Sequence, residues 1–272
     1  MTVLPIRRVE KPWGRERLPA PFSDADSGQR IGEIWFEPPP ELSCLRVKYI
    51  FTSENLSVQV HPNNQQAQAA GVGPAGKEEC WLIIAAEPGA ALGIGFREPI
   101  GPEAMRQAAL DGSIEDLLVW HPVRAGDFFY IPAGTVHAIG AGVSLIEVQQ
   151  SSDITYRLYD YGRARELHLD AGIAVANGGA YDPSLRQHVA PQGTTELVRG
   201  RYFTAHRLDG APDEALASEY AQPMLVIPLE GSVSIAGQDI APGSCGYAAS
   251  IEAVTFSAGC RSVIVHPVQS GA

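Results

Sequence analysis

Short apolar runs, each ended by glycine, proline, asparagine or aspartate, recur along most of this chain of 272 residues. Such runs, rich in β-branched and aromatic residues, are typical of β-strands. The clearest are LRVKYIF, LSVQVH, CWLIIAA, DFFYIP, VSLIEVQQ, TYRLYDY, MLVIPLEG, SVSIAG and SVIVHPV. Many short strands with frequent turn signals predict an all-β sandwich or barrel.

Helical periodicity is confined to residues 102–118. Pro102 suits a first helical turn and Gly112 suits a C-terminal cap. The expected apolar face consists of Ala104, Met105, Ala108 and Ala109. We therefore predict a short helical insertion between two sets of strands.

The organisation of the chain predicts two β units. Turn-forming residues dominate residues 178–196, which makes this segment the expected linker. Beyond it, APGSCGYAA repeats the glycine and small-residue placing of RAGDFFYIPAG, but no histidine follows. We expect the site to lie in residues 1–177, and residues 197–272 to form a degenerate second unit without metal.

The net charge of -11 argues against polyanionic partners. It disfavours nucleic acid and anionic membrane surfaces, because both would repel the chain. The N-terminus does not resemble a signal peptide, the longest apolar stretch is broken by Glu87 and Pro88, and the four cysteines form no CxxC pair. These features predict a cytoplasmic protein. The sequence leaves the oligomeric state open between a monomer and a homodimer.

The stretch GDFFYIPAGTVHAIGAG has a distinctive spacing of Gly126, Pro132, Gly134 and His137. This spacing resembles the second conserved motif of the cupin superfamily, whose members fold as jelly rolls and commonly hold one metal. A lone histidine in an apolar strand also suits a core position, so further ligands are needed.

Candidate ligands lie upstream of that motif. Gln59 and His61 share a strand face because they are two residues apart, and Glu79 begins the next strand. With His137 they form a nitrogen and oxygen set that suits zinc or another divalent metal. Spacing alone also allows Glu78 as the carboxylate and Gln59 as a residue that orients an imidazole.

Taken together, SVQVHP, GKEECW, SIEDLL, GDFFYIPAGTVHAI and IEVQQSSDITYRLYDYGR resemble type I mannose-6-phosphate isomerases in their short bacterial form. The resemblance covers roughly residues 10–176. It implies a double-stranded β-helix fold (the cupin jelly roll) in two units. It also implies one zinc ion held by Gln59, His61, Glu79 and His137, which favours Glu79 over Glu78.

The resemblance implies interconversion of mannose 6-phosphate and fructose 6-phosphate through a cis-enediol. Arg157 matches the family's active-site arginine and would stabilise the enediolate, while Glu147 matches a carboxylate that would act as base. Lys77 is expected to bind a sugar hydroxyl or to assist proton transfer.

Each assignment has a structural alternative. Arg157 could pair with Asp153 or Asp160, Glu147 could be held by hydrogen bonds, and Lys77 could be a solvated loop lysine. We assign Lys11 and Trp13 a structural role. Candidate phosphate anchors, which spacing does not rank, are Arg163, Arg165, Lys48, Ser151 and Ser152.

Two other functions fit part of the pattern. Two histidines and one carboxylate also resemble the ligand set of a non-haem iron cupin oxygenase. A non-catalytic sugar-binding cupin would retain the barrel without turnover, but it has less need for Lys77, Glu147 and Arg157 around one metal.

Overall fold

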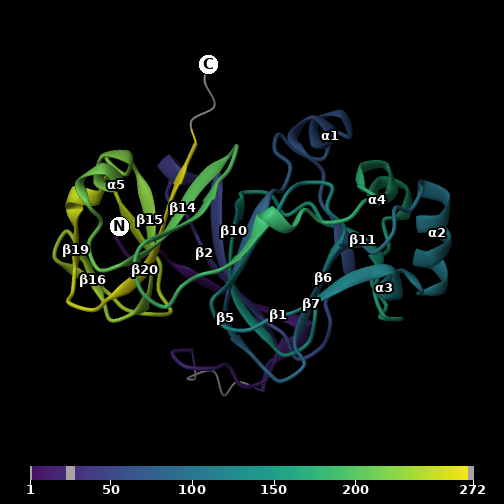
Figure 1. The fold of residues 1–272 in the computed structure, drawn as a ribbon, viewed down its shortest axis with the longest axis horizontal. Coiled ribbons are helices and arrows are strands. Elements are labelled where there is room, and N and C mark those ends of the chain that lie inside the picture. The colour runs from purple at the N-terminus through teal and green to yellow at the C-terminus, as the bar shows by residue number, and fades with distance from the viewer. Residues whose placement is uncertain (1, 23–27, 269–272) are drawn as a thin grey trace.

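A computed structural model describes residues 2–22 and 28–268 of the chain. Its strands confirm the expectation of an all-β, cupin-type architecture (Figure 1). Every pairing between its named strands is antiparallel, as in jelly rolls built from hairpins and longer crossovers.

Two sheets form the N-terminal barrel. The larger sheet has the order β1 (Ile6–Arg15), β2 (Ile31–Phe36), β3 (Leu45–Phe51), β10 (Val143–Gln150), β5 (Glu79–Ala86), β8 (Asp127–Ile131) and β12 (Arg186–His188). The smaller sheet has the order β11 (Tyr156–Tyr159), β4 (Val58–Val60), β9 (His137–Ile139), β6 (Ala91–Phe96) and β7 (Leu118–Pro122).

Two further sheets lie on the C-terminal side, on the left of Figure 1. The first has the order β13 (Thr195–Arg199), β14 (Phe203–Asp209), β20 (Arg261–Pro267), β15 (Met224–Glu230) and β18 (Gly246–Ala248). The second has the order β17 (Gln238–Ile240), β16 (Val233–Ile235) and β19 (Val254–Phe256). The segment predicted as a linker contains β12, which extends the large sheet of the barrel.

The helices gather mainly at the far end of the barrel from the C-terminal strands (Figure 1). The predicted insertion is confirmed as α2 (Pro102–Asp111) and α3 (Ile114–Leu117), and Gly112 caps α2 at φ 87°. Ala104 was expected on the apolar face but is exposed, because only Met105, Ala108 and Ala109 meet the core. Sequence periodicity did not predict α1 (Asn64–Ala69), α4 (Leu169–Val175) or α5 (Glu214–Glu219). The short 3-10 turns are η1 (Pro40–Leu42), η2 (Pro183–Leu185) and η3 (Ile251–Ala253).

The large sheet is buried on both faces. Along β5, Cys80 and Leu82 pack in the core shared with the C-terminal strands, while Trp81 and Ile83 pack inside the barrel. Alternation along the strand produces this division, because successive side chains point to opposite faces. The barrel interior therefore receives every second residue of β3, β5 and β10.

Gly95 in β6, a strand of the small sheet, tests how closely the barrel packs against the segment that contains Tyr181. Gly95 has a φ of 66°, and a Cβ placed there would lie 2.5 Å from the backbone nitrogen of Tyr181. We expect Gly95→Ala to lower the free energy of unfolding by about 2–4 kcal/mol, since the left-handed backbone and the clash both oppose a side chain. Urea unfolding measures the change. Gly89→Ala is the control, because Gly89 has a φ of 87° but open space around it; equal losses would contradict the packing argument.

A buried histidine among the C-terminal strands is expected to make stability depend on pH. His206 on β14 contacts the Tyr220 hydroxyl through Nδ1 at 2.9 Å, and burial lowers its pKa against the opposing charges of Glu219 and Glu196. The unfolded chain therefore binds a proton that the folded chain does not, so stability falls as pH drops below about 6.5. We expect His206→Gln to reduce the loss of unfolding free energy between about pH 7 and pH 5. An unchanged slope in urea titrations would refute this assignment.

Candidate metal centre and active-site cavity

His61, Glu79 and His137 meet inside the barrel. One ligand atom from each lies within 4.8 Å of the others, and all three side chains are buried. Glu79 Oε1 lies 3.6 Å from His61 Nε2 and 3.4 Å from His137 Nε2. The cluster brings together β5 of the large sheet and β9 of the small sheet, with His61 directly after β4.

The two imidazoles are held by the backbone on their outer side. His61 Nδ1 lies 2.8 Å from the Ile154 carbonyl, and His137 Nδ1 lies 2.9 Å from the Thr135 carbonyl. A proton on Nδ1 satisfies each carbonyl and leaves each Nε2 as a lone-pair donor aimed at Glu79. This is the tautomer that a metal ligand needs.

The protonation states of the two histidines and of Glu79 also suit the binding of a metal cation. Burial lowers the pKa of His137 to about 3, and burial together with Lys77 lowers the pKa of His61. Burial opposes ionisation of Glu79, but the charge of Lys77 and the nearby imidazoles place its pKa well below the usual range. Glu79 Oε1 has no hydrogen-bond partner among the described residues. An orphaned buried carboxylate oxygen beside two neutral imidazoles fits a divalent metal.

Gln59 lies against this cluster. It pairs with His137 across β4 and β9, and its Nε2 is 3.2 Å from His137 Nε2. Its Oε1 accepts a hydrogen bond from Ser57 at 3.2 Å. Rotation of the amide by half a turn would present the oxygen instead, so both a ligand role and an orienting role fit this position.

Lys77 and Glu147 form a buried charged pair next to the cluster. Lys77 is 4% exposed, which contradicts the solvated-lysine alternative. Its Nζ donates to Glu79 Oε2 and lies 3.6 Å from Glu147 Oε1. Burial disfavours the ammonium, but Glu147 and Glu79 outweigh it and raise the pKa of Lys77. Glu147 also accepts a hydrogen bond from Trp81 at 3.0 Å and pairs with Lys48 at 3.2 Å.

Arg157 pairs with Gln59 across β11 and β4. Its Nε donates to the Glu166 carbonyl at 3.0 Å. Arg157 forms no direct ion pair with Asp153 or Asp160: Asp153 pairs with Arg46 and Asp160 with Arg165, although the charge of Asp160 acts on Arg157 from nearby. Among the described residues, the hydrogen bonds of this guanidinium use only Nε.

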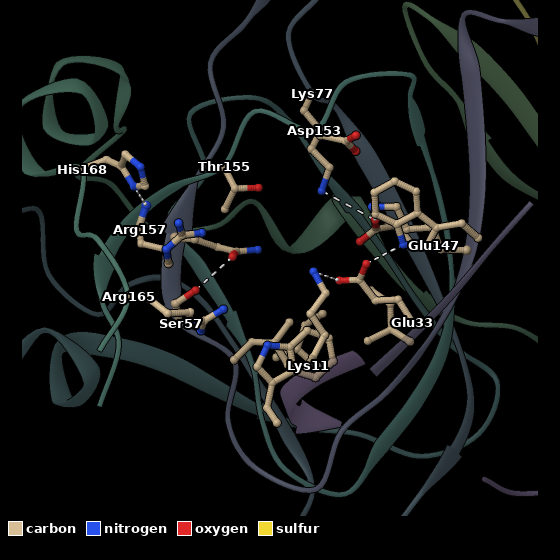
Figure 2. A pocket seen from close by; sticks show the side chains of 17 residues that line it. Lys11, Glu33, Ser57, Lys77, Glu147, Asp153, Thr155, Arg157, Arg165 and His168 are labelled. Carbon is tan, nitrogen blue, oxygen red and sulfur yellow. Dashed lines mark hydrogen bonds and ion pairs between the residues drawn. The ribbon is translucent and has the colours of Figure 1, made fainter. Parts of the chain in front are cut away.

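A cavity of about 270 Å³ lies next to the cluster, and its lining is drawn in Figure 2. The three cluster residues do not line it themselves; Gln59, which contacts His137, and Lys77, which donates to Glu79, connect the two. Gln59, Lys77, Glu147 and Arg157 all line the cavity, so the structure brings these predicted residues to one cavity. Lys77 and Lys11 reach toward it from opposite sides in the view, with Arg157, Arg165 and His168 along a third side. The wall therefore carries several cations despite the acidic chain.

The cavity also contains residues that sequence reasoning did not assign to the site. Lys11 and Trp13, predicted as structural, line it, as do Glu33 and Trp35 of β2. Lys11 lies 3.2 Å from Glu33. The sequence held one signal for these residues: Glu33 lies inside the apolar run IGEIWF. A buried acid needs a partner, so this position indicates a polar site nearby.

The structure separates the candidate phosphate anchors. Lys48 and Arg165 line the cavity. Arg163 donates to the Asn55 carbonyl at 2.5 Å and does not line the cavity. Ser151 and Ser152 line a different cavity of about 330 Å³.

The fold and this group of side chains define an all-β cupin-type protein with a buried site suited to a divalent metal. Among proteins of known sequence, the chain is 42% identical over 171 residues to mannose-6-phosphate isomerase of Streptococcus mutans and 36% identical over 192 residues to the Bacillus subtilis isomerase ManA. These matches include 60% and 67% of this chain, but only 54% and 60% of the respective relatives. No protein-family profile matches.

The solved structures agree with the sequence comparison. The crystal structure of mannose 6-phosphate isomerase from Bacillus subtilis matches with a TM-score of 0.75 and 25% identity, covering 97% of this chain and 99% of that one. A zinc-bound mannose 6-phosphate isomerase matches with a TM-score of 0.71 at 15% identity, covering 98% of this chain and 99% of that one, which shows a shared fold. By sequence and fold, the chain is similar to mannose-6-phosphate isomerases, and it spans less than two thirds of the length of the curated relatives it matches. No helix in the described part of the chain has the length and apolar character needed to cross a membrane.

Proposed function

We propose that this protein is a zinc-dependent isomerase that interconverts mannose 6-phosphate and fructose 6-phosphate through a cis-enediol. The observation that carries the proposal is the orphaned Glu79 oxygen between two imidazoles, directly beside a cavity lined by Lys77, Glu147 and Arg157. His61, Glu79 and His137, with Gln59, would hold the zinc. When bound, zinc supplies a Lewis acid for the sugar's oxygens.

The charges of Lys77 and Glu147 support the roles that we propose for them in proton transfer. Lys77 holds its proton at neutral pH because Glu147 and Glu79 raise its pKa. It is therefore suited to donate a hydrogen bond to a sugar oxygen, not to remove a proton from carbon. This leaves the Glu147 carboxylate, which lines the same cavity, as the proposed base that moves a proton between C2 and C1.

Arg157 is proposed to stabilise negative charge on the enediolate. The Nε of its guanidinium donates to the Glu166 carbonyl, and the two other nitrogens have no protein partner among the described residues. Arg165 and Lys48 are the favoured phosphate anchors because they line the cavity. Both are already paired, Arg165 with Asp160 and Lys48 with Glu147, so the phosphate would add to an existing network.

The decisive experiment is a coupled assay on the full chain. We expect zinc-loaded protein to form fructose 6-phosphate from mannose 6-phosphate, and chelator-treated protein to recover this activity when zinc is restored. Failure of the zinc-, manganese- and cobalt-loaded forms to turn over the sugar would overturn the proposal. Oxygen consumption by the iron-loaded form would support the oxygenase alternative instead.

A further inference from the structure

A second cavity of about 470 Å³ lies outside the active site, between the large barrel sheet and the C-terminal strands. We call it the junction cavity. Tyr49 and Leu82 line it, and they alternate along β3 and β5 with Lys48 and Trp81, which face the barrel interior. The junction cavity is therefore on the opposite face of the sheet from the metal centre. Its lining includes Arg207 of β14, Pro228 of β15 and Arg261 of β20, which are among the C-terminal strands on the left of Figure 1.

Most of the junction cavity has apolar walls. Its lining includes Phe22, Leu82, Ile84, Val189 and Leu229, together with Pro19, Pro21, Pro191, Pro228 and Pro242. Prolines have no backbone N–H, so this wall offers few donors to a polar ligand. A sugar would leave most of its hydroxyls unpaired there.

One end of the cavity carries an unusual cation. Arg207 on β14 is only 3% exposed, and no carboxylate of the described residues forms a direct ion pair with it, although the charges of Asp209 and Glu230 act on it from nearby. Its Nη atoms donate to the carbonyls of Ala190 and Pro191, and its Nε has no hydrogen-bond partner. A buried charge without a directly paired counter-ion is unfavourable, and an unsatisfied donor adds to that cost.

Arg261 on β20 lines the same cavity and also leaves Nε without a hydrogen bond. Its Nη1 pairs with Glu230 at 2.9 Å, and Nε lies 3.8 Å from an oxygen of Asp209, beyond hydrogen-bond distance. Asp209 accepts a hydrogen bond from Gly193 through its other oxygen. Two guanidinium groups of the cavity lining thus leave a donor unsatisfied, and only Arg261 forms a direct ion pair, with Glu230, which also lines the cavity.

We propose that the junction cavity binds a small organic anion with an apolar body. The body packs against the proline-rich wall, and the anionic group accepts hydrogen bonds at the arginine end, where it neutralises Arg207. The shared chemistry is an oxyanion, whether carboxylate, sulfonate or phosphate, attached to an aromatic or aliphatic group. The site is separate from the proposed isomerase chemistry and does not depend on it.

The probe is 8-anilinonaphthalene-1-sulfonate, compared with uncharged N-phenyl-1-naphthylamine, which has nearly the same apolar body. Fluorescence titration and calorimetry on the zinc-loaded full chain should give one sulfonate probe per chain, bound about tenfold or more tightly than the uncharged probe. Saturating mannose 6-phosphate should not displace it. Displacement by the sugar phosphate, or equal binding of both probes, would overturn the proposal.

Three variants locate the site. Ala85→Trp, at an exposed residue of the cavity wall, should abolish binding by filling the cavity while Arg207 is unchanged. Arg207→Met should remove the preference for the charged probe. Arg199→Met, at an exposed arginine on β13 outside the cavity, is the matched control and should bind as wild type. Unaltered probe binding in Ala85→Trp, with a wild-type thermal transition, would refute the location.

Discussion

Glu79→Gln is expected to abolish both metal binding and turnover. The change preserves the shape of the side chain but removes the anionic oxygen that lies between His61 and His137. We expect zinc affinity to fall by at least about a hundredfold. Loss of a residue that only hydrogen-bonds to a metal ligand can already lower metal affinity by about that much. Sugar isomerisation should fall on the order of a thousandfold. Metal analysis after dialysis and the coupled assay measure the two effects.

Glu78→Gln is the matched control for this experiment. Glu78 is adjacent in sequence but accepts a hydrogen bond from Tyr130 instead of facing the cluster. Its substitution should leave zinc content and turnover near wild type. If Glu78→Gln loses zinc while Glu79→Gln keeps it, the proposed metal centre is wrong.

Lys77→Met is expected to reduce kcat by about 10²–10⁴-fold while zinc stays bound. The ammonium is the group placed to donate to a sugar oxygen, and methionine has a similar length without the charge. Steady-state kinetics with metal analysis separates this result from loss of the cofactor. A kcat within about threefold of wild type would exclude a catalytic role.

The same substitution should make stability depend strongly on zinc. Without Lys77, Glu79 and Glu147 lose a shared counter-ion inside the barrel. Zinc can compensate Glu79, so chelation should lower the free energy of unfolding by about 3–5 kcal/mol more in Lys77→Met than in wild type. Lys77→Arg keeps the charge and should not show this additional loss. Equal chelator effects in all three proteins would contradict the pairing.

Much of the fold was predictable from local pattern. The run LRVKYIF corresponds to β3, and the proline and glycine bounds of the helical insertion match α2 and its cap. β1 was not predicted because RRVEKPWGR is largely polar and strands were sought in apolar runs. β2 was also missed, although IGEIWF is an apolar run. Helices α1, α4 and α5 each have only six or seven residues, too few for periodicity to be recognised.

The residues proposed for the site were found by motif spacing and resemblance, and their roles stay predictions. Strand alternation placed Gln59 and His61 on one face, and the structure brings both next to His137. Sequence reasoning could not show that Lys77 is buried. This residue precedes β5, and its exposure depends on Glu79 and Glu147, which lie on two different strands. Nor could sequence reasoning identify Lys11, Glu33 and Trp35 as cavity residues.

The sequence by itself determined the β class of the protein, its helical insertion and the types of side chain available for metal and sugar chemistry. These properties are local: they follow from alternation, turn residues and spacing within a few positions. Only the tertiary structure decided which cations share a carboxylate, which oxygen of Glu79 lacks a partner and where Arg207 lies against the barrel. Those outcomes depend on strands such as β1, β10 and β14, which are far apart in sequence. Their contacts are set by the packing of whole sheets.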